Sequence, residues 1–179
     1  MATWIAFLRA INLGPTRKFP MSAVVAATEA AGGTDIATHL ATGNVRLSST
    51  KRSAAAVAKA LAAAYAADRG FDVPVVVFRA SEVAEIARRG RELEDEHQPK
   101  GKHYVTIFPK PPSPAAARAI ESLDLPGDRC VVAGRAAYAL LGGDIHDSKL
   151  LRSKEFRALG EGTARTLAVL EAVARKWAE

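Results

Sequence analysis

Short hydrophobic runs and longer stretches of helical period alternate along the first half of the chain. Residues 3–9 are rich in β-forming side chains and predict a strand. A helix is expected from Pro20 to about Ala31, because proline suits the first helical turn and Gly32-Gly33 can end it. Two further short strands, 36–40 and 44–48, flank a tight glycine turn, which requires them to pair antiparallel.

A second helix and strand follow these strands. Ser53 is a good N-cap for a long helix to about Arg69, in which Val57, Leu61 and Tyr65 form the buried stripe. A continuous apolar strand over 73–78 comes next, and Ser81 caps a further helix. Residues 91–102 are then highly charged with almost no apolar side chains, which predicts a linker.

The second half begins again with a strand, over residues 103–108. Ser113 and Pro114 mark a helix start, an N-cap hydroxyl followed by proline in the first turn. Strands are expected over 129–133 and 136–141, around the turn Gly134-Arg135. Residues 144–161 give a mixed pattern, and Thr163 is expected to start the terminal helix.

Residues 3–48 and 103–141 therefore share one order: strand, loop, helix, strand, glycine turn, strand. This repetition predicts an α+β protein of two ferredoxin-like βαββ modules with mixed or antiparallel sheets and extra helices. The expected first module covers residues 1–90, the charged linker 91–102, and the second module with its terminal helix 103–179. The order disfavours a doubly wound nucleotide-binding fold, and no G-x-G-x-x-G follows the first strand.

Several segments resemble the motifs of one bacterial protein family. Residues 5–14, IAFLRAINLG, are similar to its "LLRGINVGG", Met21 matches a methionine that opens its first helix, and residues 38–45 are similar to "TYxQSGNVVF". Residues 162–166 look like its "TTRN" element. In these motifs the chain resembles the family known as domain of unknown function 1697, and the resemblance implies two ferredoxin-like βαββ modules and no established activity. Ala10 replaces a family glycine, Thr42 a serine and Thr166 an asparagine, and residues 167–169 replace Trp-Asn-Thr.

Composition and charge narrow the class of protein. The chain has 179 residues, 49% of them hydrophobic, and a net charge of +6. Residues 1–90 carry 11 basic and 6 acidic side chains, so most of the positive charge lies in the first half, which favours an anionic partner there. No apolar run approaches the roughly 20 residues of a membrane span, so no membrane partner is expected. A single cysteine, Cys130, and no signal peptide predict a cytoplasmic protein without disulfides.

The loop after the first strand is the main candidate site. Arg9, Asn12, Arg17 and Lys18 flank a strand–helix connection, where backbone N–H groups and guanidinium groups suit a phosphate or carboxylate. The alternative is that Asn12 serves the turn and the cations are solvated. Asn44 either completes a turn with Gly43 or reaches the Arg9 loop and helps to form one pocket.

Further candidates lie in the second half. Thr163 and Arg165 form either a helix N-cap or a second anion site. Cys130 sits among valines on a predicted strand and is expected to be inert and buried. No zinc, P-loop, nucleophile-elbow or EF-hand motif occurs, so the sequence indicates no metal and no cofactor.

Two hypotheses for the function follow. In the first, the protein binds an anionic partner, nucleic acid or a phosphate-bearing ligand, through its basic N-terminal half. In the second, it is a small-molecule enzyme or a nucleotide-binding protein with its site at the Arg9 loop and Asn44. Trp4 and Phe7 should point to opposite faces of the first strand, unlike the paired aromatics of an RNA-recognition motif.

Overall fold

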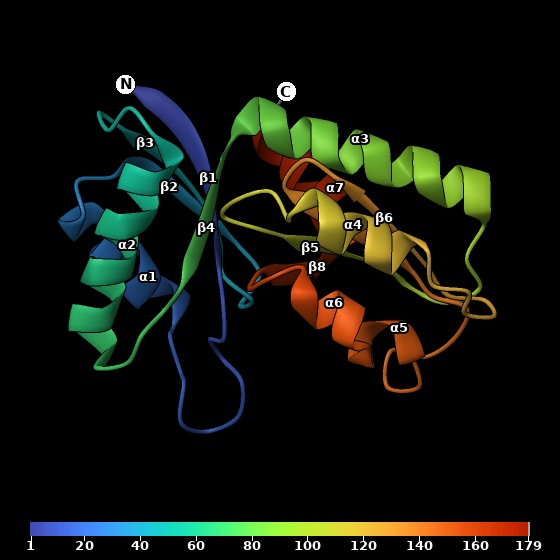
Figure 1. The fold of residues 1–179 in the computed structure, drawn as a ribbon. Helices are drawn as coiled ribbons and strands as arrows, with labels where there is room; N and C mark the ends of the chain where they lie inside the picture. Colours follow the sequence, from blue (N-terminus) through green and yellow to red (C-terminus); the bar gives the residue numbers. More distant parts are fainter. Residues whose placement is uncertain (179) are drawn as a thin grey trace. The chain divides into compact units, whose positions relative to one another are not determined.

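The computed structural model describes residues 1–178 and divides into two compact units (Figure 1). Unit 1 is Met1–Val83 together with the end of the chain from Val173, and unit 2 is Ala84–Ala172. The two boundaries fall inside two helices, each of which begins in one unit and ends in the other. Each unit is described by itself.

Unit 1 contains four strands and two complete helices. In chain order they are β1 (Ala2–Leu8), α1 (Met21–Ala30), β2 (Thr34–His39), β3 (Asn44–Ser49), α2 (Ala54–Arg69) and β4 (Val75–Arg79). The sheet order is β2-β3-β1-β4, with every neighbouring pair antiparallel. This βαββαβ order is the ferredoxin-like fold, so the module has a fourth strand beyond the βαββ order that the sequence predicts.

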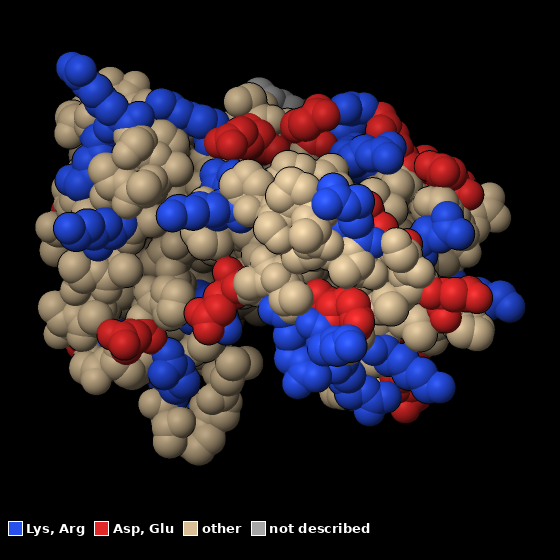
Figure 2. Space-filling model, viewed as in Figure 1, with Lys and Arg blue, Asp and Glu red and all other residues tan. Residues whose placement is uncertain are grey.

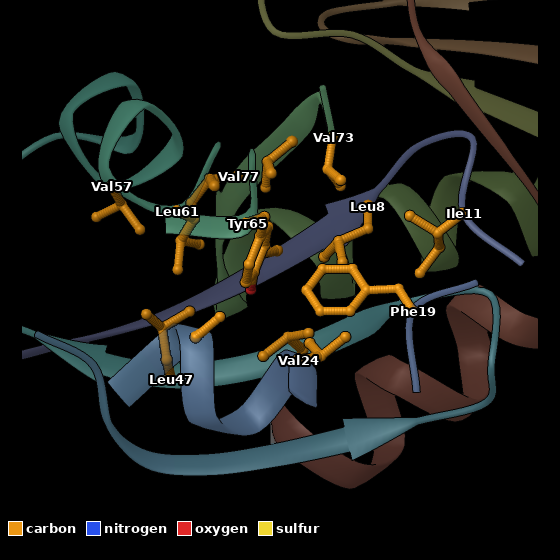
Figure 3. Packing of buried hydrophobic residues seen from close by; sticks show 14 of the residues in the cluster. Leu8, Ile11, Phe19, Val24, Leu47, Val57, Leu61, Tyr65, Val73 and Val77 are labelled. Atoms are coloured by element: carbon orange, nitrogen blue, oxygen red, sulfur yellow. The ribbon is translucent and has the colours of Figure 1, made fainter. Parts of the chain in front are cut away.

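Local sequence signals account for the helices of unit 1. The Ser53 hydroxyl accepts a hydrogen bond from the Ala56 backbone N–H at the start of α2, and Gly70 ends that helix in the left-handed conformation, as expected of these residues. Val57, Leu61 and Tyr65 form its buried stripe, as predicted. They point toward Leu8 of β1 and Val24 of α1, so both helices bury their apolar faces on one side of the sheet (Figure 3).

The core of unit 1 has one aromatic centre. The rings of Phe19 and Tyr65 meet edge to face at 5.3 Å, and the Tyr65 hydroxyl lies 2.7 Å from the hydroxyl of Thr28. Burial raises the pKa of Tyr65 to about 12. Trp4 belongs to this core, whereas Phe7 packs edge-on against Phe78, which confirms that the two side chains point to opposite faces of β1.

Unit 2 repeats the topology. Its strands are β5 (His103–Ile107), β6 (Arg129–Ala133), β7 (Ala136–Leu140) and β8 (Thr163–Thr166), in the sheet order β6-β7-β5-β8. Between them lie α4 (Pro114–Glu121), α5 (Lys149–Arg152) and α6 (Lys154–Ala158). Ser113 caps α4 through the Ala116 N–H, with Pro114 in the first turn, as predicted. The fold class expected from sequence, α+β with two ferredoxin-like modules, is therefore confirmed.

Two long helices frame the second sheet. α3 (Ala80–His97) precedes β5, and α7 (Leu167–Trp177) follows β8. The Tyr138 hydroxyl of β7 donates to the Ile86 carbonyl of α3 at 3.2 Å, which places α3 beside the sheet face that bears Tyr138. α4 and α6 contribute to a separate hydrophobic cluster with Phe108 and Cys130. Both faces of this sheet are therefore packed.

Three expectations about local structure differ from the observed elements. Ser81 is not an N-cap, because α3 begins at Ala80 and Ser81 lies in its first turn. Thr163 does not start the terminal helix: it begins strand β8, where it pairs with Ile107, and the helix begins at Leu167. The charged segment predicted as a linker from residue 91 is helical as far as His97. Ion pairs stabilise this polar helix. Arg88 pairs with Glu92, four residues on, and Arg91 pairs with Glu94, three residues on, and both spacings place the partners side by side on a helix.

Candidate functional site

The loop between β1 and α1 is held together by the side chain of Asn12. Its Nδ2 donates to the carbonyls of Phe19 (3.1 Å) and Ala41 (2.6 Å), and its Oδ1 accepts from the Phe19 N–H (2.8 Å). Asn12 also has a left-handed backbone (φ 54°), which asparagine tolerates well. These contacts give Asn12 a structural role in closing the loop onto the β2–β3 hairpin.

Arg17 serves the same loop. Its Nε donates to the Ala10 carbonyl and its guanidinium donates to the Asp72 carbonyl, both at 2.5 Å, and it lies 4.5 Å from the centre of the Phe71 ring. The guanidinium therefore joins the loop to the segment before β4. Its neighbour Lys18 is exposed to solvent. A site that used both cations would have to take Arg17 away from these backbone partners.

Asn44 is buried at the start of β3, with 0% of its surface exposed. Its Nδ2 donates to the His39 carbonyl at 2.6 Å, across the turn, and lies 3.3 Å from the Thr42 hydroxyl. The Leu8 N–H donates to the Gly43 carbonyl, so the hairpin lies against the end of β1. The structure thus brings Asn12 and Asn44 to the same end of the sheet, as the pocket hypothesis requires. The side-chain amides of both residues, however, donate hydrogen bonds to backbone carbonyls.

Arg9 follows β1 at this end of the sheet. Its backbone N–H donates to the Pro74 carbonyl at 2.9 Å, and the residue is half-buried. The sequence predicts an anion clamp at this position, and that role stays a prediction. The backbone of Arg9 thus joins the end of β1 to the segment before β4, at the same end of the sheet as Asn12 and Asn44.

Ala10 has a left-handed backbone (φ 55°), where its β-carbon is strained. This explains why the motif that it resembles has glycine at this position. Replacing Ala10 with glycine is expected to raise the free energy of unfolding by about 0.5–1 kcal/mol, since glycine adopts this conformation without strain. Urea unfolding of the two proteins measures the difference. An equal or lower midpoint for the glycine variant would mean that the loop does not hold this backbone in solution.

Thr163 and Arg165 lie on β8, on the sheet face that they share with Ile107 and Val105. Arg165 is 8% exposed, and its guanidinium donates to the Thr163 hydroxyl (3.0 Å) and the Ala164 carbonyl (2.9 Å). Burial lowers the pKa of Arg165 to about 10. The two residues are brought together as the sequence suggests, but in a buried strand and not at a helix N-terminus. They belong to unit 2, whereas Arg9, Asn12 and Asn44 belong to unit 1.

Cys130 shows none of the properties of a reactive thiol. It is buried among apolar neighbours on β6, and burial raises its pKa to about 12. The Ser148 hydroxyl already has two hydrogen-bond partners. It donates to the Asp128 carboxylate at 2.7 Å and accepts a hydrogen bond from the Leu151 N–H at the start of α5. Within residues 1–178, no group of three or more His, Cys, Asp or Glu side chains is placed to hold a metal ion.

A surface that the sequence analysis missed lies on α5 and α6. We call it the α5–α6 basic face; it comprises four exposed cations within nine residues: Lys149, Arg152, Lys154 and Arg157. Figure 2 shows Lys and Arg side chains gathered where Figure 1 draws these two helices. Averaging charge over half of the chain hides this cluster, because residues 91–179 have 14 basic against 13 acidic side chains.

Comparison with known proteins gives the family but not the activity. A family model described as "Protein of unknown function (DUF1697)" matches residues 1–138. The chain belongs to this family. The match includes the β1–α1 loop and the β2–β3 hairpin, and the DUF1697 glycine that Ala10 replaces falls in the strained loop described above. The element at 162–166 that resembles "TTRN" lies beyond the matched residues.

The fold of this DUF1697 protein is similar to that of a solved structure. "The structure of conserved bacterial protein SP0830 from Streptococcus pneumoniae" matches with a TM-score of 0.72 and 16% identity, and covers 98% of each chain. At this identity the likeness shows the fold alone. None of the curated proteins matches the chain. Among the described residues, no helix is long and apolar enough to cross a membrane.

Proposed function

We propose that this protein binds nucleic acid through phosphate contacts made by the α5–α6 basic face. The observation that carries the proposal is the exposure of Lys149, Arg152, Lys154 and Arg157, against a single acidic side chain, Glu155, in the same stretch. The sequence favours an anionic partner for the N-terminal half. The proposed partner is still anionic, but the proposed contact surface lies in unit 2 and not in the N-terminal half.

The apolar side chains of α5 and α6 explain why the cations face solvent. Leu150 and Leu159 are buried in the cluster that includes Ile120 of α4, and Leu151 and Phe156 pack against it. Ser148 and Ser153 cap the two short helices through the N–H groups of Leu151 and Phe156. The helices are therefore fixed on their inner side, and the intervening charged residues lie on the outer side.

Little of the positive charge on this face is compensated. Arg152 donates to the carbonyls of Ser148 and Asp147, and Arg157 to those of Ser153 and Arg152, so these bonds orient the guanidinium groups and leave their charge intact. Glu155 approaches Lys154 no closer than 3.9 Å. Closely spaced, solvated cations of this kind suit a phosphate backbone, whose binding releases counterions.

The burial of the first strand supports backbone contact over base stacking. Ferredoxin-like RNA-recognition modules stack bases on exposed aromatic side chains of the sheet. Here Trp4 and Phe7 of β1 are 1% and 0% exposed. The β1 surface therefore offers no stacking platform. Binding that depends on backbone charge should show little preference for sequence.

The test is the salt dependence of binding to a labelled duplex, measured by fluorescence anisotropy. For the double variant Lys149→Gln/Lys154→Gln, the slope of log K against log salt concentration is expected to fall in magnitude by about 2, roughly one for each lost phosphate contact. Affinity should fall about equally for duplexes of different sequence. Neither lysine side chain donates a hydrogen bond within the described residues, so the double variant should fold as wild type does.

The matched control removes the same charge from unit 1. Lys18 and Lys59 are exposed, and Lys18→Gln/Lys59→Gln is expected to leave the slope within experimental error. If this control lowers the slope and the α5–α6 variant does not, the binding surface lies in the N-terminal half. If the wild-type protein binds neither single-stranded nor double-stranded nucleic acid at low salt, the proposed function is wrong.

A further inference from the structure

A pocket of about 440 Å³ lies in unit 2, where α3, the start of β5 and the start of α7 meet. We call it the α3–α7 pocket; its charged and polar lining residues are Arg91, Glu94, Lys102, His103, Thr166 and Glu171. None of these residues takes part in the α5–α6 basic face. The apolar part of its wall comes from the first turn of α7.

His103 is an unusual residue to find in the lining of this pocket. Its side chain is 1% exposed, and its Nδ1 lies 3.3 Å from a carboxylate oxygen of Glu94. Burial outweighs the nearby carboxylates and lowers the pKa of His103, so the ring is neutral near pH 7. A neutral ring beside a carboxylate has its proton on Nδ1, because only that tautomer can donate to Glu94.

The other nitrogen of the same ring, Nε2, is buried and has no hydrogen-bond partner within residues 1–178. A buried acceptor without a partner destabilises the folded state, and a phenyl ring at this position would avoid that cost. The ring packs against Tyr138, with 6.0 Å between centres, as an apolar ring could also do. Packing therefore does not explain a histidine here, whereas the hydrogen bond to Glu94 does.

Charge in the pocket is partly compensated: Lys102, an exposed cation of the lining, makes no ion pair within residues 1–178, whereas Arg91 is paired. The Nε and Nη2 of Arg91 donate to the two carboxylate oxygens of Glu171, each at 2.8 Å, so these two side chains form a bidentate pair. Among residues 1–178, Glu94 receives at its carboxylate a long contact from Arg91 (3.4 Å) and the bond from His103, and no other hydrogen bond. Its side chain is 33% exposed. A carboxylate with about four acceptor sites thus keeps capacity for another donor.

We propose that the α3–α7 pocket binds the protonated amine of a small molecule, with Glu94 as the carboxylate that accepts it and His103 as the residue that positions Glu94. The ammonium group replaces solvent at Glu94. Thr166 also lines the pocket, and a hydroxyl is a suitable second acceptor for an ammonium group. The alkyl part of the ligand lies against Leu167 and Ala168. This site is independent of nucleic-acid binding.

The experiment titrates the full chain with n-butylammonium and, separately, with 1-butanol and butyrate, by isothermal titration calorimetry. Butylammonium is expected to bind one site at least tenfold more tightly than 1-butanol, since only the ammonium pairs with Glu94. Glu94→Gln should weaken butylammonium binding at least tenfold. Glu92→Gln, on the same helix but paired with Arg88, is the control and should bind as wild type does.

His103 is tested by variants that separate positioning from folding. His103→Phe keeps a ring and removes both nitrogens, so it should bind butylammonium at least fivefold more weakly while its unfolding midpoint stays equal or rises. His103→Asn, whose amide can donate to Glu94 from the position of Nδ1, should restore part of the affinity. The proposal is overturned if butylammonium binds no better than 1-butanol, if butyrate is preferred, or if Glu94→Gln binds as wild type does.

Discussion

Alanine at position 101 is expected to lower the free energy of unfolding by about 3 kcal/mol, because its β-carbon has no room. It would lie against the carbonyl oxygen of Gly143 and 2.8 Å from that of Leu141. The Gly101 N–H already donates to the Leu141 carbonyl at 2.8 Å, which fixes the close approach of the two segments. Backbone atoms cannot move aside as the end of a side chain can, so the segments must separate and strain that bond.

The control is Gly143→Ala, at the other side of the same contact. A β-carbon at Gly143 would meet no atom within 4 Å, so this variant should unfold within about 0.5 kcal/mol of wild type. Urea unfolding followed by circular dichroism compares the three proteins. Equal midpoints for Gly101→Ala and Gly143→Ala would show that the close approach does not exist in solution.

Asn44→Ala is expected to lower the free energy of unfolding by about 2–3 kcal/mol. The substitution removes the donor to the His39 carbonyl from a position that is 0% exposed, and it leaves a small cavity beside the turn. If Asn44 instead serves a ligand, alanine should leave stability unchanged and abolish ligand binding. Stability alone therefore separates the two roles that the sequence leaves open.

His39→Ala provides the comparison for Asn44. It keeps the backbone carbonyl that accepts from Asn44 and removes only a half-exposed side chain, 3.1 Å from the Lys176 ammonium. The expected loss is below about 1 kcal/mol. Thermal unfolding of both variants, followed by circular dichroism, shows which substitution causes the larger loss of stability. A smaller loss for Asn44→Ala than for His39→Ala would reject the structural role.

Two helix starts are predicted correctly from signals confined to one turn of chain, whereas the caps predicted at Ser81 and Thr163 are wrong. Ser53, and Ser113 with Pro114, start their helices as expected, because a hydroxyl cap depends only on the three residues that follow it. Strand β8 was missed for the opposite reason. Its four residues carry little pattern of their own, and they form a strand because Tyr104 to Ile107 pair with them from far away in the chain.

The candidate site shows the same contrast between local signals and contacts made far away in the chain. The sequence selects Asn12 and Asn44 as candidate ligand residues, which stays a prediction, whereas the partner of Asn12 at Ala41 lies 29 positions away and cannot be predicted from the loop itself. The charged residues from 91 to 97 were predicted as a linker from composition, although Arg91 and Glu94 have the spacing of a helical pair. The α5–α6 basic face becomes visible when charged residues are counted over windows of about nine residues, whereas a count over half of the chain hides it.

The placement of the two tryptophans makes the independence of the units measurable. The chain has only Trp4 and Trp177, and both belong to unit 1, the second through the last turns of α7. Tryptophan fluorescence, excited at a wavelength where tyrosine does not absorb, therefore reports the unfolding of unit 1, whereas the helical signal in circular dichroism comes from both units. Coincident transitions by the two probes would show a single cooperative protein. Separated transitions would give the stability of each unit from one titration of the unlabelled, wild-type chain.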